Sequence, residues 1–277
     1  MEKFTIEIAG IPVLIRCRYS VNRDFLRDYL SEKEPVCTIE PSAEDLVRMQ
    51  SDFDRMNEAE GFPARRRSDE FLENNAIHSL LAEKLVGHGV LLMHGSALCM
   101  DGEAYIFTAK SGTGKSTHTR LWREMFGDRV WMINDDKPML RIFGEKETGK
   151  GACADSCRDA AGNDRNDHVN ERVMVYGTPW NGKHRLSRNA SAPLKAIVNL
   201  HRDEQNHIEP MTKADAFPEL MKRAFFSQNP STMAGIMILE KKILNAVDFY
   251  TLGCNMEPEA ARTAWEGMNG LLAKGSL

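Results

Sequence analysis

The sequence predicts an α/β fold built around a phosphate-binding loop, and two segments support this prediction. A short apolar and β-branched run at 104–108 precedes the glycine-rich segment 109–116, and apolar residues at helical spacing then continue to Phe126. A second apolar run, 130–133, ends in the acidic pair Asp135-Asp136. Strand, glycine loop, helix and second strand in this order are typical of a sheet with helices on its faces.

The segment 109–116 fits the phosphate-loop pattern, with Ala109 where the strict form has glycine. Gly112 and Gly114 allow backbone conformations in which successive N–H groups can point at phosphate oxygens. The helix expected to begin near Lys115 adds its positive N-terminal end to the same site. A turn that binds nothing is the alternative, but a chance match would lack the flanking strand and helix. The residues expected to bind the nucleotide are Ser111, Gly112, Thr113, Gly114, Lys115, Ser116 and Thr117.

The acidic pair Asp135-Asp136 follows the second apolar run directly. Open α/β sheets bind ligands at the carboxyl ends of their strands, so both carboxylates are expected beside the loop. Adjacent acids can divide the work, because one can hold Mg²⁺ while the other accepts the proton of an attacking hydroxyl. The alternative is an ordinary turn leading into Lys137, and the nearby phosphate loop favours the functional interpretation.

These residues resemble a known family, HPr kinase/phosphorylase and its relatives. The run 94–98, which begins His94-Gly95, precedes the loop at the same separation as in that family, and an Asp-Asp pair follows the loop helix there too. The later segments 176–184, 193–197 and 252–256 resemble its uncharacterised, HPr-kinase-like branch. The likeness covers roughly residues 89–205 well and the two ends weakly.

The resemblance implies a mixed-sheet phosphate-loop core flanked by helices, of the type shared with ATP-dependent phosphoenolpyruvate carboxykinase. It implies that Lys115 and Ser116 carry phosphate and metal, that Asp135 is the catalytic base, and that Asp136 is the second metal ligand. His94 falls where the family has a histidine near the reacting phosphoryl group. The implied activity is an ATP- and Mg²⁺-dependent kinase that phosphorylates a hydroxyl, with a serine of a peptide or protein as the expected acceptor.

The sequence departs from the regulatory enzyme of the family at two loop positions. Ala109 replaces glycine, and Thr117 stands where that enzyme usually carries an acid after the loop serine. Its glycine-rich signature for the protein substrate is not recognisable here, so the acceptor is left open. Two other functions also remain open: a nucleotide-binding sensor that transfers no phosphate, and a carboxykinase-like enzyme. The chain is short for the second of these.

Composition narrows the classes of partner. The chain has 277 residues, of which 42% are hydrophobic, enough for a sizeable core. The net charge of -4 gives no support for general nucleic-acid binding. No run approaches eighteen apolar residues and the first residues lack a secretory apolar region, so a cytoplasmic protein without membrane partners is expected. The expected partners are a nucleoside triphosphate and a hydroxyl-bearing acceptor; a homo-oligomer is left open.

The remaining pattern predicts a small α+β appendage at 1–88 and a nucleotide-binding core at 89–277 with a polar, mobile insert at 149–171, either a lid or a passive loop. The appendage should contain a hairpin at 4–17, a helix opened by Ser42 and a helix at 72–85. Strands are expected at 174–176, 196–200 and 249–252, and helices at 212–226, 230–246 and 261–272.

Three further groups of residues are candidates for a functional role. Cys153, Cys157 and His168 do not form a convincing zinc site, because no second ligand pair has finger or ribbon spacing. The segment 177–183 is either a wall of the acceptor or phosphate site, in which Lys183, His184 or Arg185 stabilises transferring charge, or a turn in which Trp180 anchors the core and the basic residues lie at the surface. His201 and His207 have no partner spacing and are expected to be surface or satisfied histidines.

Overall fold

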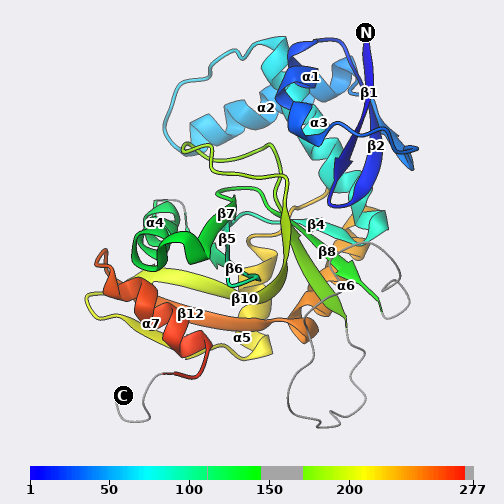
Figure 1. Cartoon of the computed structure of the whole chain (residues 1–277). Helices are drawn as coiled ribbons and strands as arrows, with labels where there is room; N and C mark the ends of the chain where they lie inside the picture. Colours follow the sequence, from blue (N-terminus) through cyan, green and yellow to red (C-terminus); the bar gives the residue numbers. More distant parts are fainter. Residues whose placement is uncertain (111, 145–170, 272–277) are drawn as a thin grey trace.

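The structure, a computed structural model, describes residues 1–110, 112–144 and 171–271. It is a mixed α/β fold with two sheets and flanking helices (Figure 1). Its strands are β1 (Glu2–Ile8), β2 (Ile11–Cys17), β3 (Cys37–Ile39), β4 (Val90–Leu92), β5 (Ser96–Met100), β6 (Glu103–Thr108), β7 (Val130–Asn134), β8 (Met139–Phe143), β9 (Arg172–Tyr176), β10 (Ser191–Arg202), β11 (His207–Pro210) and β12 (Asp248–Cys254).

The helices lie between groups of these strands along the chain. They are α1 (Val21–Phe25), α2 (Ala43–Ala59), α3 (Asp69–Leu85), α4 (Lys115–Phe126), α5 (Lys213–Met221), α6 (Pro230–Ala246) and α7 (Glu259–Met268) over the described residues, with short 3₁₀ turns η1 (Arg27–Tyr29), η2 (Val86–His88) and η3 (Gly127–Arg129). Within the described ranges no helix is both long and apolar enough to cross a lipid bilayer.

The first elements of the chain form a small sheet with helices beside it, at the top of Figure 1. β1 and β2 make the predicted antiparallel hairpin, which turns at Ala9-Gly10, and β3 adds a parallel strand to β2. α2 begins at a capping box in which Ser42 accepts a hydrogen bond from the Asp45 amide and the Asp45 carboxylate accepts one from the Ser42 amide. The hairpin and the helix opened by Ser42 are therefore confirmed.

The larger sheet is mixed and curled, and β10 links its two parts. In one part β10 lies between the parallel strands β6 and β12, and β5, β7 and β11 extend the sheet on either side. In the other, the first residues of β10 pair with β9, which continues through β8 to β4 with antiparallel pairing throughout. This connectivity places the carboxyl ends of β6 and β10 next to each other.

Helices cover both faces of the part of the sheet that contains β6. Alternation along β6 sends Tyr105 and Phe107 toward α4 and α7, and Ala104 and Ile106 toward the cluster that includes α5 and α6. A strand buried on both faces reads as a continuous apolar run, which is why the sequence made β6 easy to predict. Another cluster of buried hydrophobic side chains joins the hairpin and α3 to β4 and to Trp180.

The sequence also misjudged some elements. The helix predicted at 212–226 begins at Thr212 as expected but ends at Met221, three residues after Pro218. The final helix ends at Met268, and Leu272, which was expected on it, lies outside the described residues. β8 was not predicted at all. The insert at 149–171 lies outside the described residues except for Glu171, and so do Cys153, Cys157 and His168.

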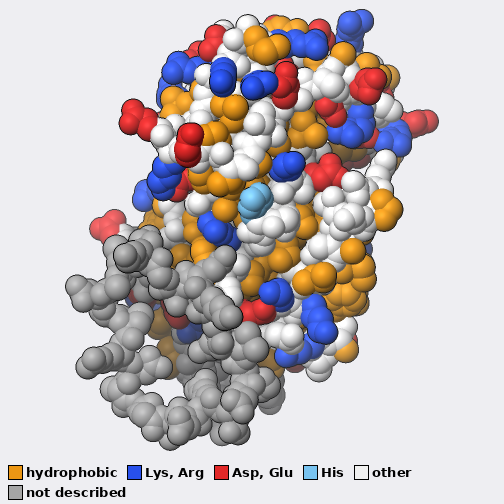
Figure 2. Space-filling view, turned by 90° about the vertical axis from the view of Figure 1, so that its right-hand side faces the viewer, with side chains coloured by type: hydrophobic (Ala, Val, Ile, Leu, Met, Phe, Trp, Pro, Cys, Tyr) orange, Lys and Arg blue, Asp and Glu red, His pale blue; other side chains and the backbone are white. Residues whose placement is uncertain are grey.

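Charged side chains of both signs are interspersed on the face shown in Figure 2, with hydrophobic side chains between them. This surface agrees with the small net charge of -4. A mixed surface of this kind does not attract a polyanion through its overall field, so any binding of phosphate groups must come from a local arrangement.

Candidate active site

The glycine-rich loop connects the end of β6 to the first turn of α4. Gly112 has a backbone φ of +74° and Gly114 one of +124°, values that residues with a Cβ rarely adopt. Arg202, the last residue of β10, holds this loop from outside: its guanidinium donates to the carbonyl of Gly112 at 2.7 Å and to that of Thr113 at 3.2 Å. The predicted loop residue Ser111 lies outside the described residues.

The first turn of α4 carries the remaining predicted nucleotide-binding residues. Lys115, Ser116 and Thr117 are all half-buried, and no side chain among the described residues caps this helix start. The uncapped N–H groups and the helix dipole suit an anion. The ammonium of Lys115 donates to the carbonyl of Ala109 at 3.3 Å, so its side chain folds back over the start of the loop.

Three charged side chains lie close enough to Lys115 to change its pKa. Burial lowers the pKa of Lys115, the positive charges of Arg223 and Lys137 lower it further, and Asp136 opposes them. The structure therefore brings the loop lysine and one acid of the predicted pair into the same electrostatic environment. The excess of positive charge around Lys115 and Asp136 is what a multiply charged anion requires.

The acid pair follows β7 in a turn that Asn134 organises. The side chain of Asn134 is fully buried, and its oxygen accepts hydrogen bonds from the amides of Asp136 at 2.8 Å and Lys137 at 2.6 Å. Its amide group donates to the carbonyls of Thr178 at 3.0 Å and Trp180 at 3.1 Å. Asn134 thus joins the acidic turn to the segment 177–183.

The two acids have different surroundings. Asp135 is 5% exposed; its Oδ1 accepts a hydrogen bond from the amide of Gly182 at 2.7 Å, and its buried Oδ2 has no hydrogen-bond partner among the described residues. A Cβ at position 182 would lie 3.1 Å from that Oδ2, so glycine is what admits the carboxylate. A buried carboxylate oxygen left open in this way is costly unless a proton or a ligand fills it.

Asp136 is more exposed and pairs with His94. The Nε2 of His94 lies 3.2 Å from Oδ1 of Asp136, and the amide of Gly95 donates to the Asp136 carbonyl at 3.1 Å. Burial alone raises the pKa of Asp136, but the hydrogen bond from His94 and the charges of Lys137, His94 and Lys115 outweigh it. The pKa of Asp136 therefore lies below its ordinary value, and this carboxylate stays ionised.

The segment 177–183 has one residue in the core and another in contact with the acid pair. Trp180 is buried: its indole N–H donates to Asn74 of α3 at 2.9 Å, and its ring lies 4.6 Å from that of His78. It is thus a core anchor. The amide of Gly182 also contacts Asp135, so the same turn lies against the acid pair, and its role in binding an acceptor stays a prediction. Lys183, His184 and Arg185 are exposed.

Sequence reasoning missed Asn134, Gly182 and His78. Asn134 stood directly before the acid pair, where an asparagine often bonds to amides two residues on, so a local signal existed. The contact between Gly182 and Asp135 spans 47 positions and had no local signal. Burial and the charge of Lys137 lower the pKa of His78 to about 3, and its Nε2 has no partner among the described residues. The neutral ring therefore lies against the site without a charge of its own.

Comparison with known proteins adds little. No family model matches the chain, and no curated protein matches it. Among solved structures, the HPr(Ser) kinase/phosphatase from Coxiella burnetii is similar at 12% sequence identity and a TM-score of 0.24, over 65% of this chain and 93% of that one. A likeness this weak carries no argument about the site, whose interpretation depends on the residues described above.

Proposed function

We propose that this protein is an ATP-dependent phosphotransferase that phosphorylates a hydroxyl group, with Mg²⁺ as its cofactor. The observation that carries the proposal is the open Oδ2 of buried Asp135, on a turn whose next residue shares its electrostatic environment with Lys115. A glycine loop, a lysine and a carboxylate that can take a proton are the parts that phosphoryl transfer requires. The resemblance carried by residues 94–136 supports the same activity.

Each group has a distinct task in this proposal. The loop amides and the start of α4 hold the phosphates, and Lys115 neutralises charge that develops on the transferred group. Asp135 accepts the proton of the attacking hydroxyl at Oδ2 while the Gly182 amide holds Oδ1 in place. The hydrogen bond from His94 keeps Asp136 ionised and oriented. Catalysis then comes mainly from positioning and charge neutralisation.

The donor set fits Mg²⁺. The Ser116 hydroxyl and the Asp136 carboxylate are hard oxygen donors, which this ion prefers, and Asp136 is the acid whose ionised form is favoured. When bound, Mg²⁺ would offset the negative charge of the phosphates.

In this proposal the hydroxyl acceptor binds beside the turn 177–183. This turn supplies the amide that positions Asp135, and it ends in the exposed Lys183, which the exposed His184 and Arg185 follow. A serine of a peptide or protein is the acceptor that the resemblance supports. Basic residues at this edge favour an acceptor with acidic groups near the hydroxyl.

Two substitutions test the assignment with ATP labelled in its γ-phosphate, a panel of hydroxyl acceptors and a cell extract. Lys115→Ala should abolish nucleotide turnover. Asp135→Asn should lower transfer by roughly 100- to 10,000-fold, the usual contribution of a general base, while Mg²⁺-nucleotide binding is largely kept. Lys241→Ala and Asp128→Asn change exposed residues of the same types and serve as matched controls.

Full transfer by Asp135→Asn would refute its role as the base. Nucleotide binding by the unaltered protein without any labelled acceptor would instead favour a sensor that transfers no phosphate. Failure of the unaltered protein to bind Mg²⁺-ATP would remove both functions together.

A further inference from the structure

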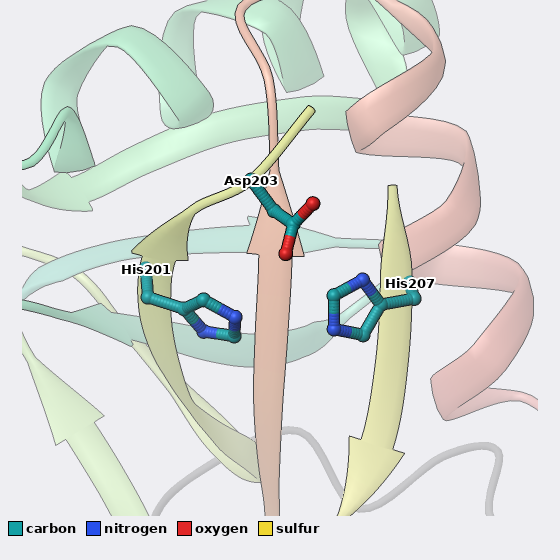
Figure 3. Close-up of side chains that lie close together, drawn as sticks. All are labelled: His201, Asp203 and His207. Carbon is teal, nitrogen blue, oxygen red and sulfur yellow. The ribbon is translucent and has the colours of Figure 1, made fainter. Parts of the chain in front are cut away.

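Two histidines and an aspartate converge at the end of β10, outside the acid pair and its surroundings. His201 lies on β10, Asp203 follows that strand directly, and His207 begins β11. Figure 3 shows the three side chains pointing into one space, and one ligand atom from each lies within 4.8 Å of the others. Both histidines lie at the surface as expected, His201 exposed and His207 half-buried, and the fold brings them together although their spacing in the sequence gave no sign of it.

The pairing of β10, β12 and β11 explains why the two imidazoles meet. Gly253 of β12 lies opposite His201 on one side and opposite His207 on the other, and residues opposite each other share one face of a sheet. The ring of His207 lies where a side chain at position 253 would be. A Cβ at that position would lie 2.1 Å from Cε1 of His207. Glycine in the middle strand thus makes room for the pair.

Backbone contacts hold the other groups in place. The amide of Asp203 donates to the carbonyl of Cys254 at 3.1 Å, and its carboxylate accepts from the amide of Gln205 at 3.0 Å. The Nδ1 of His207 lies 3.1 Å from the carbonyl of Gln205. A carbonyl can only accept, so this contact places the proton on Nδ1 and leaves the lone pair on Nε2. A metal-ligating histidine typically has such a carbonyl partner.

We propose that His201, Asp203 and His207 form a binding site for a divalent transition-metal cation of the Zn²⁺ type. Two imidazoles and one carboxylate are a zinc donor set, whereas Mg²⁺ prefers oxygen ligands alone. Three protein ligands leave a fourth position for water or another ligand. Donors on tetrahedral zinc lie roughly 3.4 Å apart, so the ligand atoms, which lie within 4.8 Å of one another, need to close by at most about 1.4 Å.

The site is tested by titrating the full-length protein with Zn²⁺ in a calorimeter and with Co²⁺ in a spectrophotometer, without added Mg²⁺. The expected result is one equivalent of metal and a Co²⁺ spectrum of nitrogen and oxygen ligation. His201→Ala and His207→Ala should each weaken this binding by roughly 100-fold. Gly253→Ala should weaken it as well, because its new methyl group displaces the His207 ring. His88→Ala, at an exposed histidine, should leave it unchanged.

Unchanged stoichiometry and affinity in both histidine variants would overturn the proposal, and so would a Co²⁺ spectrum dominated by thiolate charge transfer. Circular dichroism checks that each variant is folded, and His201 is exposed enough for its loss to spare the core. The test needs no ATP or acceptor, so its failure says nothing against the phosphotransferase activity, and the reverse also holds.

Discussion

Asn134 ties the acid pair to the opposite wall of the candidate active site. Both polar atoms of its side chain form hydrogen bonds. The oxygen accepts from the backbone amides of Asp136 and Lys137, and the nitrogen donates to backbone carbonyls of the segment 177–183. The Thr178 hydroxyl adds a second link, donating to the Lys137 carbonyl at 2.8 Å. A buried and fully connected polar group of this kind specifies one geometry, because any shift leaves several partners unsatisfied.

Asn134→Ala should lower the free energy of unfolding by about 3 kcal/mol, because each buried polar group left without a partner costs about 1–3 kcal/mol. It should also lower phosphoryl transfer by roughly 100-fold, since the acids lose their position. Urea unfolding and transfer of labelled phosphate measure the two effects. Asn245→Ala, at an exposed asparagine, is the matched control. An Asn134→Ala protein with normal transfer would show that the acid turn holds its geometry unaided.

Among the elements, β10 contacts the glycine loop from the strand next to β6. It pairs with β6 as far as Asn199 and with β12 as far as Arg202, and from this end Arg202 reaches two loop carbonyls. The neighbours of Arg202 in sequence, His201 and Asp203, belong to the proposed metal site. One strand end thus supports both proposed sites.

Arg202→Ala should weaken binding of Mg²⁺-ATP by about 10-fold, because an exposed charge-assisted hydrogen bond that orders the loop contributes about 1–1.5 kcal/mol. Arg202→Lys should be intermediate, since an ammonium lacks the planar fork that can reach two carbonyls together. Calorimetric titration with a non-hydrolysable ATP analogue measures the affinity. Arg27→Ala, at another exposed arginine, is the control. Equal affinity in all four proteins would mean that the loop needs no support from β10.

At the scale of the whole molecule, the sequence predicted what local pattern determines and missed what distant pairing determines. Local pattern predicted β6, the loop and α4, because a buried strand, two glycines and a helical apolar stripe follow one another in the sequence. The contact of Asp135 with Gly182 and the meeting of His201 with His207 arise only when strands pair, which no local spacing encodes. The functional roles of the loop residues and the boundary at residue 88 stay predictions.

The N-terminal segments nevertheless contact the candidate active site through a continuous polar path. Glu73 of α3 accepts hydrogen bonds from the amides of Arg18 and Tyr19 and from the side chain of Asn22. Asn74 donates to Asn22 at 3.0 Å and accepts from Trp180 at 2.9 Å. Trp180 in turn offers its carbonyl to Asn134. The path therefore runs from the end of the hairpin to the acid turn, so α1 and α3 help to hold that turn in place.

Trp180→Phe tests this path with little loss of volume. It removes the indole N–H, leaves the Asn74 oxygen without its partner, and should lower the free energy of unfolding by about 1–2 kcal/mol. Because Trp180 is hydrogen-bonded to Asn134 of the acid turn, and to no glycine-loop residue that the structure describes, kcat for transfer should fall severalfold while affinity for Mg²⁺-ATP stays unchanged. Trp265→Phe, at a partly buried tryptophan of α7, should affect stability without this fall in kcat. If Trp180→Phe instead weakened nucleotide binding and spared kcat, the N-terminal segments would act through the loop, and the path to Asn134 would have no catalytic meaning.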